Sequence, residues 1–75
     1  MYYDFPGEVM VYVITYNTFQ FWTGGGWSFD SRDAKTYEYA TSRITQDAVK
    51  KAKWGIDEAD QRNVILVKSY IRCLH

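Results

Sequence analysis

The residues that most often carry out catalysis are scarce in this chain. It has one cysteine, Cys73, and one histidine, His75, which is the last residue. Nucleophilic and general-base catalysis usually needs a histidine held beside a serine, cysteine or carboxylate, and terminal residues are commonly frayed. A zinc site needs three or four ligands, but the chain has no Cys-x-x-Cys pair and no second histidine. We therefore expect no catalytic residue, no metal and no cofactor, and we interpret Cys73 as a core residue of the last strand.

Two short clusters could bind a small ligand. Asp57, Glu58 and Asp60 have the spacing of a metal site or an acid pair, but such a run is more typical of a solvated connector. The glycines at 24–26 suggest a phosphate-binding loop, but no Gly-Lys-Ser/Thr follows and no long helix begins directly after them. These glycines are better interpreted as a sharp bend between two segments that carry tryptophan.

Aromatic residues make up 19% of the 75 residues, with three Trp, seven Tyr and four Phe. One small core cannot bury all of these rings completely, although an aromatic core with scattered surface rings remains an alternative. Tyr and Trp are enriched where proteins bind one another, so some rings are expected to form a partner surface around the glycine loop. The expected partner-binding residues, with the lysines considered below, are Tyr16, Trp22, Gly25, Trp27, Lys50, Lys51 and Lys53.

Two of the tryptophans have different expected roles. Trp22 lies on the opposite side of its strand from Phe19 and Phe21, which makes it the expected exposed contact. Trp27 shares its parity with Phe29, so that both rings are expected to enter the core together.

The net charge of zero conceals an uneven distribution. Residues 1–33 hold four acidic residues and one basic residue, and residues 34–75 hold eight basic and five acidic residues, giving net charges of −3 and +3. Lys50, Lys51 and Lys53 with exposed rings would suit a nucleic acid, which is the alternative to a protein partner. However, the rings concentrate in residues 2–39 and the basic residues in 43–72, and lysines also favour the C-terminal turn of a helix.

The hydrophobic pattern predicts mainly strands before residue 40. Residues 9–16 are β-branched and aromatic on both faces, which is typical of a central strand. A reversal at Asn17-Thr18 and a hairpin to residues 19–23 follow, and residues 27–29 are either the return strand of a second hairpin or an irregular segment. Residues 30–34 predict one helical turn, and residues 35–39 a short strand.

One helix is predicted, over residues 45–54. Thr45 is the expected N-cap, Gly55 the expected left-handed residue after the helix, and lysines occupy the last turn. A polar connector at 57–61 and a strand at 64–73 complete the chain. The apolar stripe that is expected to pack on the sheet consists of Ile44, Ala48, Val49 and Ala52.

Length and composition complete these expectations. A chain this short supports one core, so residues 1–75 are expected to form a single domain. No segment has the length of a membrane span, residues 1–7 lack the features of a secretory signal, and a single cysteine points to the reducing cytoplasm. The predicted fold class is α+β: an antiparallel sheet of three to four strands with one main helix on one face, in ββ(β)αβ order.

The chain also resembles a group of small phage and prophage proteins. The resemblance covers residues 9–71 and rests on short motifs. These are Val11-Tyr12-Val13-Ile14, Phe21-Trp22-Thr23-Gly24-Gly25-Gly26-Trp27-Ser28, Asp30, Ala34-Lys35 with Tyr37, and a helix with Asp47-Ala48 and Ala52.

Several compact phage proteins of this size bind and block a host defence protein, and the anti-CRISPR proteins are among them. The resemblance therefore implies a non-catalytic inhibitor or adaptor that acts on a bacterial defence complex in the host cytoplasm. The chain lacks the strong net acidity of many anti-CRISPR proteins, which argues against mimicry of DNA. The expected partner is a protein, with a nucleic acid as the alternative, no membrane, and a homodimer formed through the sheet as a third possibility.

Overall fold

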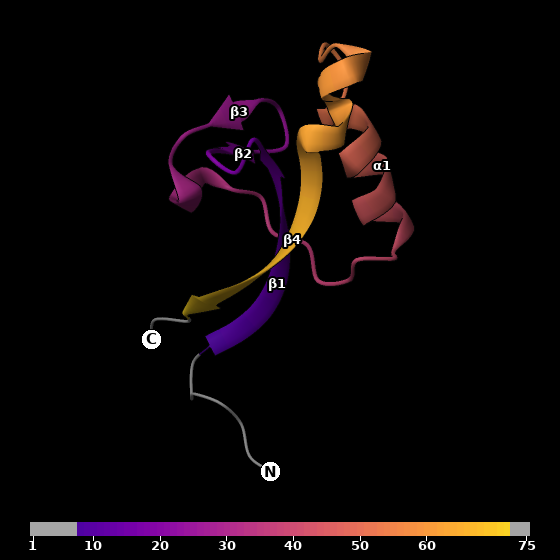
Figure 1. The fold of residues 1–75 in the computed structure, drawn as a ribbon. Helices are drawn as coiled ribbons and strands as arrows, with labels where there is room; N and C mark the ends of the chain where they lie inside the picture. The colour runs from indigo at the N-terminus through magenta and orange to yellow at the C-terminus, as the bar shows by residue number, and fades with distance from the viewer. Residues whose placement is uncertain (1–7, 73–75) are drawn as a thin grey trace.

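The computed structural model describes residues 8–72, which form one antiparallel sheet and one main helix (Figure 1). The strands that it describes have the order β3-β2-β1-β4 in the sheet. This arrangement confirms the predicted α+β class. The elements are β1 (Glu8–Tyr16), β2 (Gln20–Trp22), β3 (Trp27–Ser28), η1 (Ser31–Asp33), α1 (Arg43–Ala52), η2 (Glu58–Asn63) and β4 (Val64–Arg72), where η marks a 3-10 helix.

Strand β1 is central, as its two apolar faces predicted. It pairs along its whole length with β4, from Glu8 opposite Arg72 to Tyr16 opposite Val64, and at its end with β2. The predicted reversal is confirmed as well. Asn17 and Thr18 both have positive φ, at 54° and 63°, a conformation that asparagine tolerates better than most residues.

The glycine loop returns the chain into β3, which confirms the second hairpin. Its hydrogen bonds come from Thr23, whose backbone N–H donates to the Gly26 carbonyl at 2.9 Å and whose Oγ1 accepts from the Gly26 N–H at 3.1 Å. Gly24 is the position that requires glycine, because its φ is +103° and an added Cβ would lie 3.2 Å from Cδ of Lys35.

The segment between β3 and α1 contains less strand than predicted. The single turn expected at residues 30–34 is present as η1, capped by Asp30. The expected strand at 35–39 is reduced to one bridge, in which Tyr37 exchanges backbone hydrogen bonds of 2.7 and 2.8 Å with Tyr12. The prediction was wrong in length because β2 already pairs with the edge of β1 next to this bridge. The backbone N–H of Lys35 donates to the Trp22 carbonyl instead, at 2.9 Å.

Helix α1 begins and ends earlier than predicted. Ser42 rather than Thr45 is the N-cap, since its side chain accepts a hydrogen bond from the Thr45 N–H at 3.3 Å. The helix ends at Ala52, and Gly55 has the expected positive φ two residues after the C-cap, Lys53. The predicted polar connector folds as η2.

The apolar stripe of α1 differs from the prediction at one position. Ala48, Val49 and Ala52 pack on the core as expected, but Ile44 is 73% exposed. The buried residue of the first turn is Thr45, whose Oγ1 donates to the Tyr39 carbonyl at 2.6 Å. This bond replaces the hydration that the hydroxyl loses, so that a polar residue can take the buried place.

The core lies between α1 and the sheet. Its buried members come from three strands, the bridge and the helix: Ile14, Trp22, Tyr37, Ala52 and Val64. Strand β4 agrees with the prediction from Val64 onward, whereas the core role proposed for Cys73 falls outside the described residues. Neither α1 nor the 3-10 helices in the described part of the chain have the length and apolar character needed to cross a membrane.

One buried hydroxyl has no partner in residues 8–72. Thr15 lies in β1 with only 4% of its surface exposed, and no described group forms a hydrogen bond with its Oγ1. Burying a hydroxyl without a hydrogen bond reduces stability. We therefore expect Thr15→Val to raise the free energy of unfolding by ~1 kcal/mol, as measured by urea denaturation.

Thr45→Val is the matched control for this substitution. It removes a buried hydroxyl that does form a hydrogen bond and leaves the Tyr39 carbonyl without its donor. We expect it to lower stability by ~1–3 kcal/mol. Equal losses in the two variants would show that the Thr15 hydroxyl also stabilises the fold.

Candidate functional site

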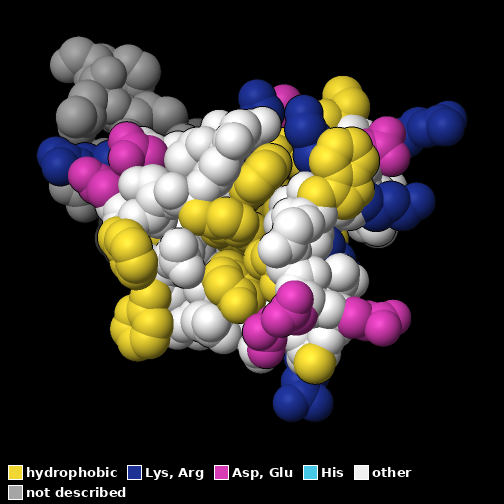
Figure 2. Space-filling view, turned by 90° about the horizontal axis from the view of Figure 1, so that it is seen from above, with side chains coloured by type: hydrophobic (Ala, Val, Ile, Leu, Met, Phe, Trp, Pro, Cys, Tyr) yellow, Lys and Arg dark blue, Asp and Glu magenta, His cyan; other side chains and the backbone are white. Residues whose placement is uncertain are grey.

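Three of the expected binding residues form an aromatic cluster at the end of the sheet. The ring centroids of Trp22 and Trp27 lie 5.2 Å apart in an edge-on arrangement, and those of Tyr16 and Trp27 lie 5.7 Å apart with a tilt of 44°. These distances are within the range of favourable aromatic pairs. Figure 2 looks down on this end of the molecule and shows hydrophobic side chains gathered across its centre, with charged side chains mainly around them.

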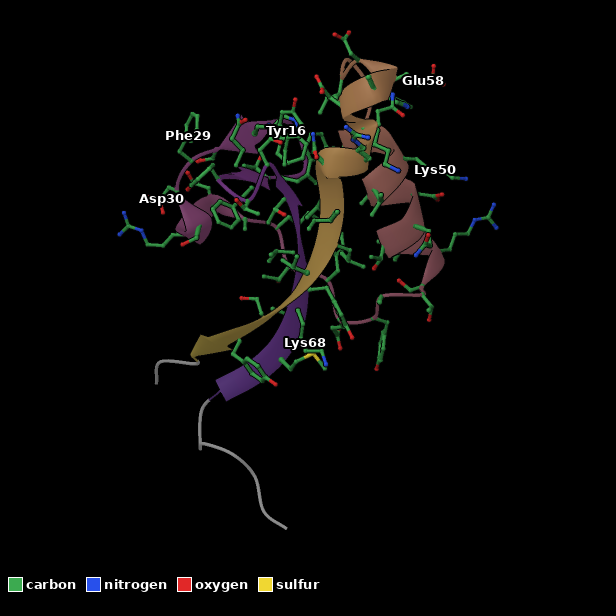
Figure 3. The ribbon with its side chains drawn as sticks, in the orientation of Figure 1. Tyr16, Phe29, Asp30, Lys50, Glu58 and Lys68 are labelled. Atoms are coloured by element: carbon green, nitrogen blue, oxygen red, sulfur yellow. The ribbon has the colours of Figure 1, made fainter. Side chains whose placement is uncertain are left out.

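The structure contradicts the expected exposure of Trp22 and agrees in part with the expected burial of Trp27, which packs against the core. Trp22 is only 7% exposed and belongs to the core, whereas Trp27 is half-buried. Phe29, which was expected to accompany Trp27 inward, is 77% exposed and lies on the side of the sheet away from α1 (Figure 3). Trp22 is buried because it lies in the same cluster as Ile14 and Ala52, on the face that α1 covers.

Trp22 also lies at one end of a cleft beside α1. This cleft, of about 210 Å³, separates the helix from β2, the glycine loop and the bridge at Tyr37. Lys51, one of the expected binding residues, lines it together with Trp22 and Gly24. The other lining residues are Lys35, Tyr37, Ile44, Asp47 and Ala48.

A second hollow, of about 380 Å³, continues the cleft toward the N-terminus of α1. It shares Lys35, Tyr37 and Ile44 with the cleft, and it extends to Tyr39 and Ser42. We call the two hollows together the α1 groove. Its floor contains the buried Tyr37, while Ile44 and Tyr39 are exposed large apolar side chains on its border. The groove is therefore an amphipathic depression with two uncovered apolar side chains.

The groove contains charges of both signs. Lys35, Lys51 and Asp47 line the cleft, and Glu38 lines the adjoining hollow. Burial raises the pKa of the Tyr37 phenol, and a side-chain interaction with Trp22 opposes this by a smaller amount. The phenol is therefore neutral at physiological pH and contributes a hydroxyl to the floor rather than a charge.

The remaining expected residues surround the groove rather than line it. Lys50 is exposed on α1, Lys53 is half-buried at the C-cap, and a Cβ added to Gly25 would meet no atom within 4 Å. Lys50 and Phe29 project to opposite sides of the molecule in Figure 3. The structure therefore brings together Tyr16, Trp22 and Trp27, places Lys51 with Trp22 in the lining of the cleft, and leaves Gly25 at an open loop tip.

Outside the groove, polar side chains organise η1. Asp30 accepts hydrogen bonds from the backbone and side chain of Arg32, which lower the pKa of the Asp30 carboxyl. Ser28 Oγ donates to the Asp33 carboxylate at 2.8 Å. These contacts are exposed and account for the local turn. Across residues 8–72, no three His, Cys, Asp or Glu side chains are grouped closely enough to hold a metal ion.

Several residues of this surface were not among those expected from the sequence. Lys35, Tyr37 and Tyr39 were assigned to a short strand, and Ile44 to the buried stripe. Trp54, which is 74% exposed directly after the lysines of α1, was not singled out. The sequence signal available for this surface was the pair Lys35 and Tyr39, which lie two positions on either side of the buried Tyr37.

Comparisons with protein-family models, curated proteins and solved structures find no match to this chain.

Proposed function

We propose that this chain is a non-catalytic protein-binding domain whose contact surface is the α1 groove. The observation that carries the proposal is the exposure of Ile44 and Tyr39 on the border of an amphipathic depression. Clusters of exposed apolar side chains with a polar surround mark interaction sites, and protein interfaces combine an apolar centre with a polar rim. The charged side chains of Lys35, Lys51 and Asp47 supply such a rim.

A preformed groove also suits a binding role in such a small chain. Its floor residues Trp22 and Tyr37 are buried in the core, so folding has already fixed the shape of the groove that a partner would enter. Less side-chain freedom is then lost on binding, which favours affinity. The aromatic cluster continues from this floor along the same face of the sheet, through the contact between Trp22 and Trp27.

The partner class that we propose is a bacterial defence complex such as CRISPR–Cas. This part of the proposal rests on the resemblance to small phage proteins. The chain would act in the host cytoplasm as a stoichiometric inhibitor. Its expected activity is to restore phage plaques on a bacterial strain whose CRISPR–Cas system targets that phage.

Ile44→Asp is the expected loss-of-binding variant. The substitution places a charge where an apolar contact is proposed, and the acidic side chain lies in the first turn of α1, where it interacts favourably with the helix dipole. We expect unchanged folding by circular dichroism and at least ~10-fold weaker binding, or ~1.4 kcal/mol. Binding is measured by co-purification with the defence complex followed by calorimetry, and inhibition by the plaque assay.

Phe29→Ser is the matched control, because Phe29 is as exposed as Ile44 but lies away from the groove. It is expected to bind and inhibit as the wild type does. If Ile44→Asp binds normally, the groove is not the contact surface. If the wild-type chain neither binds nor inhibits, the proposed partner class is wrong.

A second candidate function is favoured by Trp54. This exposed ring follows Lys50, Lys51 and Lys53, and lysines beside a stacking ring suit single-stranded nucleic acid. Such binding would weaken steeply as the salt concentration rises and would depend on Trp54. Titration of a labelled single-stranded oligonucleotide against wild type and Trp54→Ala at two salt concentrations separates this candidate from protein binding.

A further inference from the structure

Strand β4 is the long outer strand of the sheet. It pairs with β1 over nine residues, and no strand in residues 8–72 pairs with its other edge. In Figure 1, β4 crosses in front of β1 with α1 to one side and η1 to the other, and no labelled element lies in front of it. Within residues 8–72, this edge therefore has no strand partner.

The hydrogen bonds of β1 show which backbone groups of β4 point outward. Tyr12 exchanges its N–H and C=O with Tyr37, on the side away from β4, while Asn17 donates to the Asn63 carbonyl on the side of β4. Even-numbered residues of β1 thus point away from β4 and odd-numbered residues point toward it. The register then directs the N–H and C=O groups of Leu66, Lys68 and Tyr70 outward from the sheet.

An edge with outward-pointing N–H and C=O groups is complementary to another β-strand. A partner that pairs with this edge must therefore present its own backbone C=O and N–H groups in an extended strand. The side chains of β4 restrict it further, because Lys68 lies in the middle of the edge and is exposed. A strand that placed a positive charge opposite Lys68 would be repelled.

We infer that β4 binds β4 of a second copy of this chain in antiparallel orientation, with Val67 on the two-fold axis. This register pairs Leu66 with Lys68 of the other copy and Val64 with Tyr70, so all three outward-pointing residues form hydrogen bonds. It separates the two lysines, whereas a shift that centres the axis on Lys68 would place them opposite each other. The two sheets then become one.

The choice of a second copy rests on this self-complementarity. Most of the strand takes part, because positions 64–70 pair with positions 70–64, and no like charges lie opposite each other within these positions. Two-fold symmetry makes each contact occur twice, as it does in most homodimers. The proposed dimer uses the edge of the sheet and not the α1 groove, so its failure and that of the proposed function are separate results.

Lys68→Pro and Lys68→Thr test the edge. The Lys68 N–H points outward, so proline removes a donor that the β1 ladder does not use, and edge strands tolerate proline. Threonine removes the same charge but keeps the N–H. We expect wild type and Lys68→Thr to dimerise with rising concentration in sedimentation equilibrium. Lys68→Pro is expected to remain folded and to dimerise at least ~30-fold more weakly, because two hydrogen bonds are lost.

Three results would overturn the proposal. They are a wild-type chain that stays monomeric into the millimolar range, a folded Lys68→Pro variant that dimerises normally, and a Lys68→Thr variant as monomeric as the proline variant. The last result would assign the association to the lysine side chain rather than to the backbone edge.

Disulfide trapping tests the register and remains informative if Lys68→Pro fails to fold. In a Cys73→Ser background, Val67→Cys would face its copy across the axis at a Cα separation of ~4.5 Å, which a disulfide can span. Ser69→Cys is the control, since the two residues 69 would lie four positions apart along the strand, at ~13 Å. A disulfide dimer at 67 and not at 69 is expected on oxidation, and the opposite result excludes this register.

Discussion

Trp22→Ala is expected to lower the free energy of unfolding by ~3–5 kcal/mol. The side chain is 7% exposed and contacts the core between Ile14 and the helix, so its removal leaves a cavity and also removes the ring contact with Trp27. Because a domain of this size has a total stability near the lower end of ~5–15 kcal/mol, the variant should unfold near physiological temperature. Thermal and urea denaturation monitored by circular dichroism provide the measurement.

Trp54→Ala is the control for this experiment. Trp54 is 74% exposed and lies beyond the end of α1, so its removal should change stability by no more than ~0.5 kcal/mol. Trp27→Ala should fall between the two variants, because the ring is half-buried and contacts both Tyr16 and Trp22. If Trp22→Ala melted at the temperature of the wild type, Trp22 would not be a central core residue. The prediction from the sequence, that Trp22 is an exposed contact, would then hold.

The two hairpins could be predicted from the sequence because their signals are local. β-branched and aromatic residues on both faces identify β1 as central, and Asn17 with the glycine loop identify the reversals. Each signal is contained in a few neighbouring residues. The predicted succession of strands and one main helix along the chain agrees with the structure, whereas the pairing of β4 with β1 was not predicted.

The burial of the tryptophans required information that is not local. The alternation placed Phe21 and Trp22 on opposite faces of β2, as the structure also does. Nothing in that segment indicates which face α1 covers, because the helix begins about twenty residues later. The register of the first hairpin decides it: with Thr15 opposite Phe21, Ile14 and Trp22 lie on the other face of the sheet, and both are buried in the core cluster with Ala52 of α1.

The same limitation explains Ile44 and Thr45. Hydrophobicity alone assigns the isoleucine to the core and the threonine to the helix end. In the structure, Ser42 caps the helix, and the Thr45 hydroxyl reaches the Tyr39 carbonyl from the first turn. This hydrogen bond, to a carbonyl six residues earlier in the chain, permits Thr45 to be buried, while Ile44 lines the groove. The exposed border of the candidate site therefore arises from a polar contact that a hydrophobic pattern does not contain.

The α1 groove could not be assembled from the sequence either. Its residues come from β2, from the segment around Tyr37 and from α1, which are joined only by tertiary packing. Within this set, Trp22 and Lys51 were both expected to contact a partner, whereas Gly24, Lys35 and Tyr37 were not. The chemistry expected for the site, apolar contact bordered by charge, remains the same, but the side chains that provide it differ.

The two alanines of α1 provide the second large effect and a test of the groove itself. Ala52 is completely buried against the sheet, so Ala52→Leu forces additional atoms into a filled space and should cost ~1–3 kcal/mol. Ala48 is half-buried and lines the cleft, where a leucine side chain can extend into open volume. Ala48→Leu should therefore cost less than ~1 kcal/mol.

These two variants should also differ in binding, in the opposite direction. Leucine at position 48 would fill much of the cleft of about 210 Å³ and exclude a partner side chain from the floor formed by Trp22 and Tyr37. At a temperature where both variants are folded, Ala48→Leu should weaken the proposed complex while Ala52→Leu preserves it. Urea denaturation and calorimetric titration of the same samples measure both effects. Equal losses of stability in the two variants would show that the cleft is closed in solution. Unchanged binding by Ala48→Leu would show that the partner contacts the border at Ile44 and Tyr39 rather than the cleft.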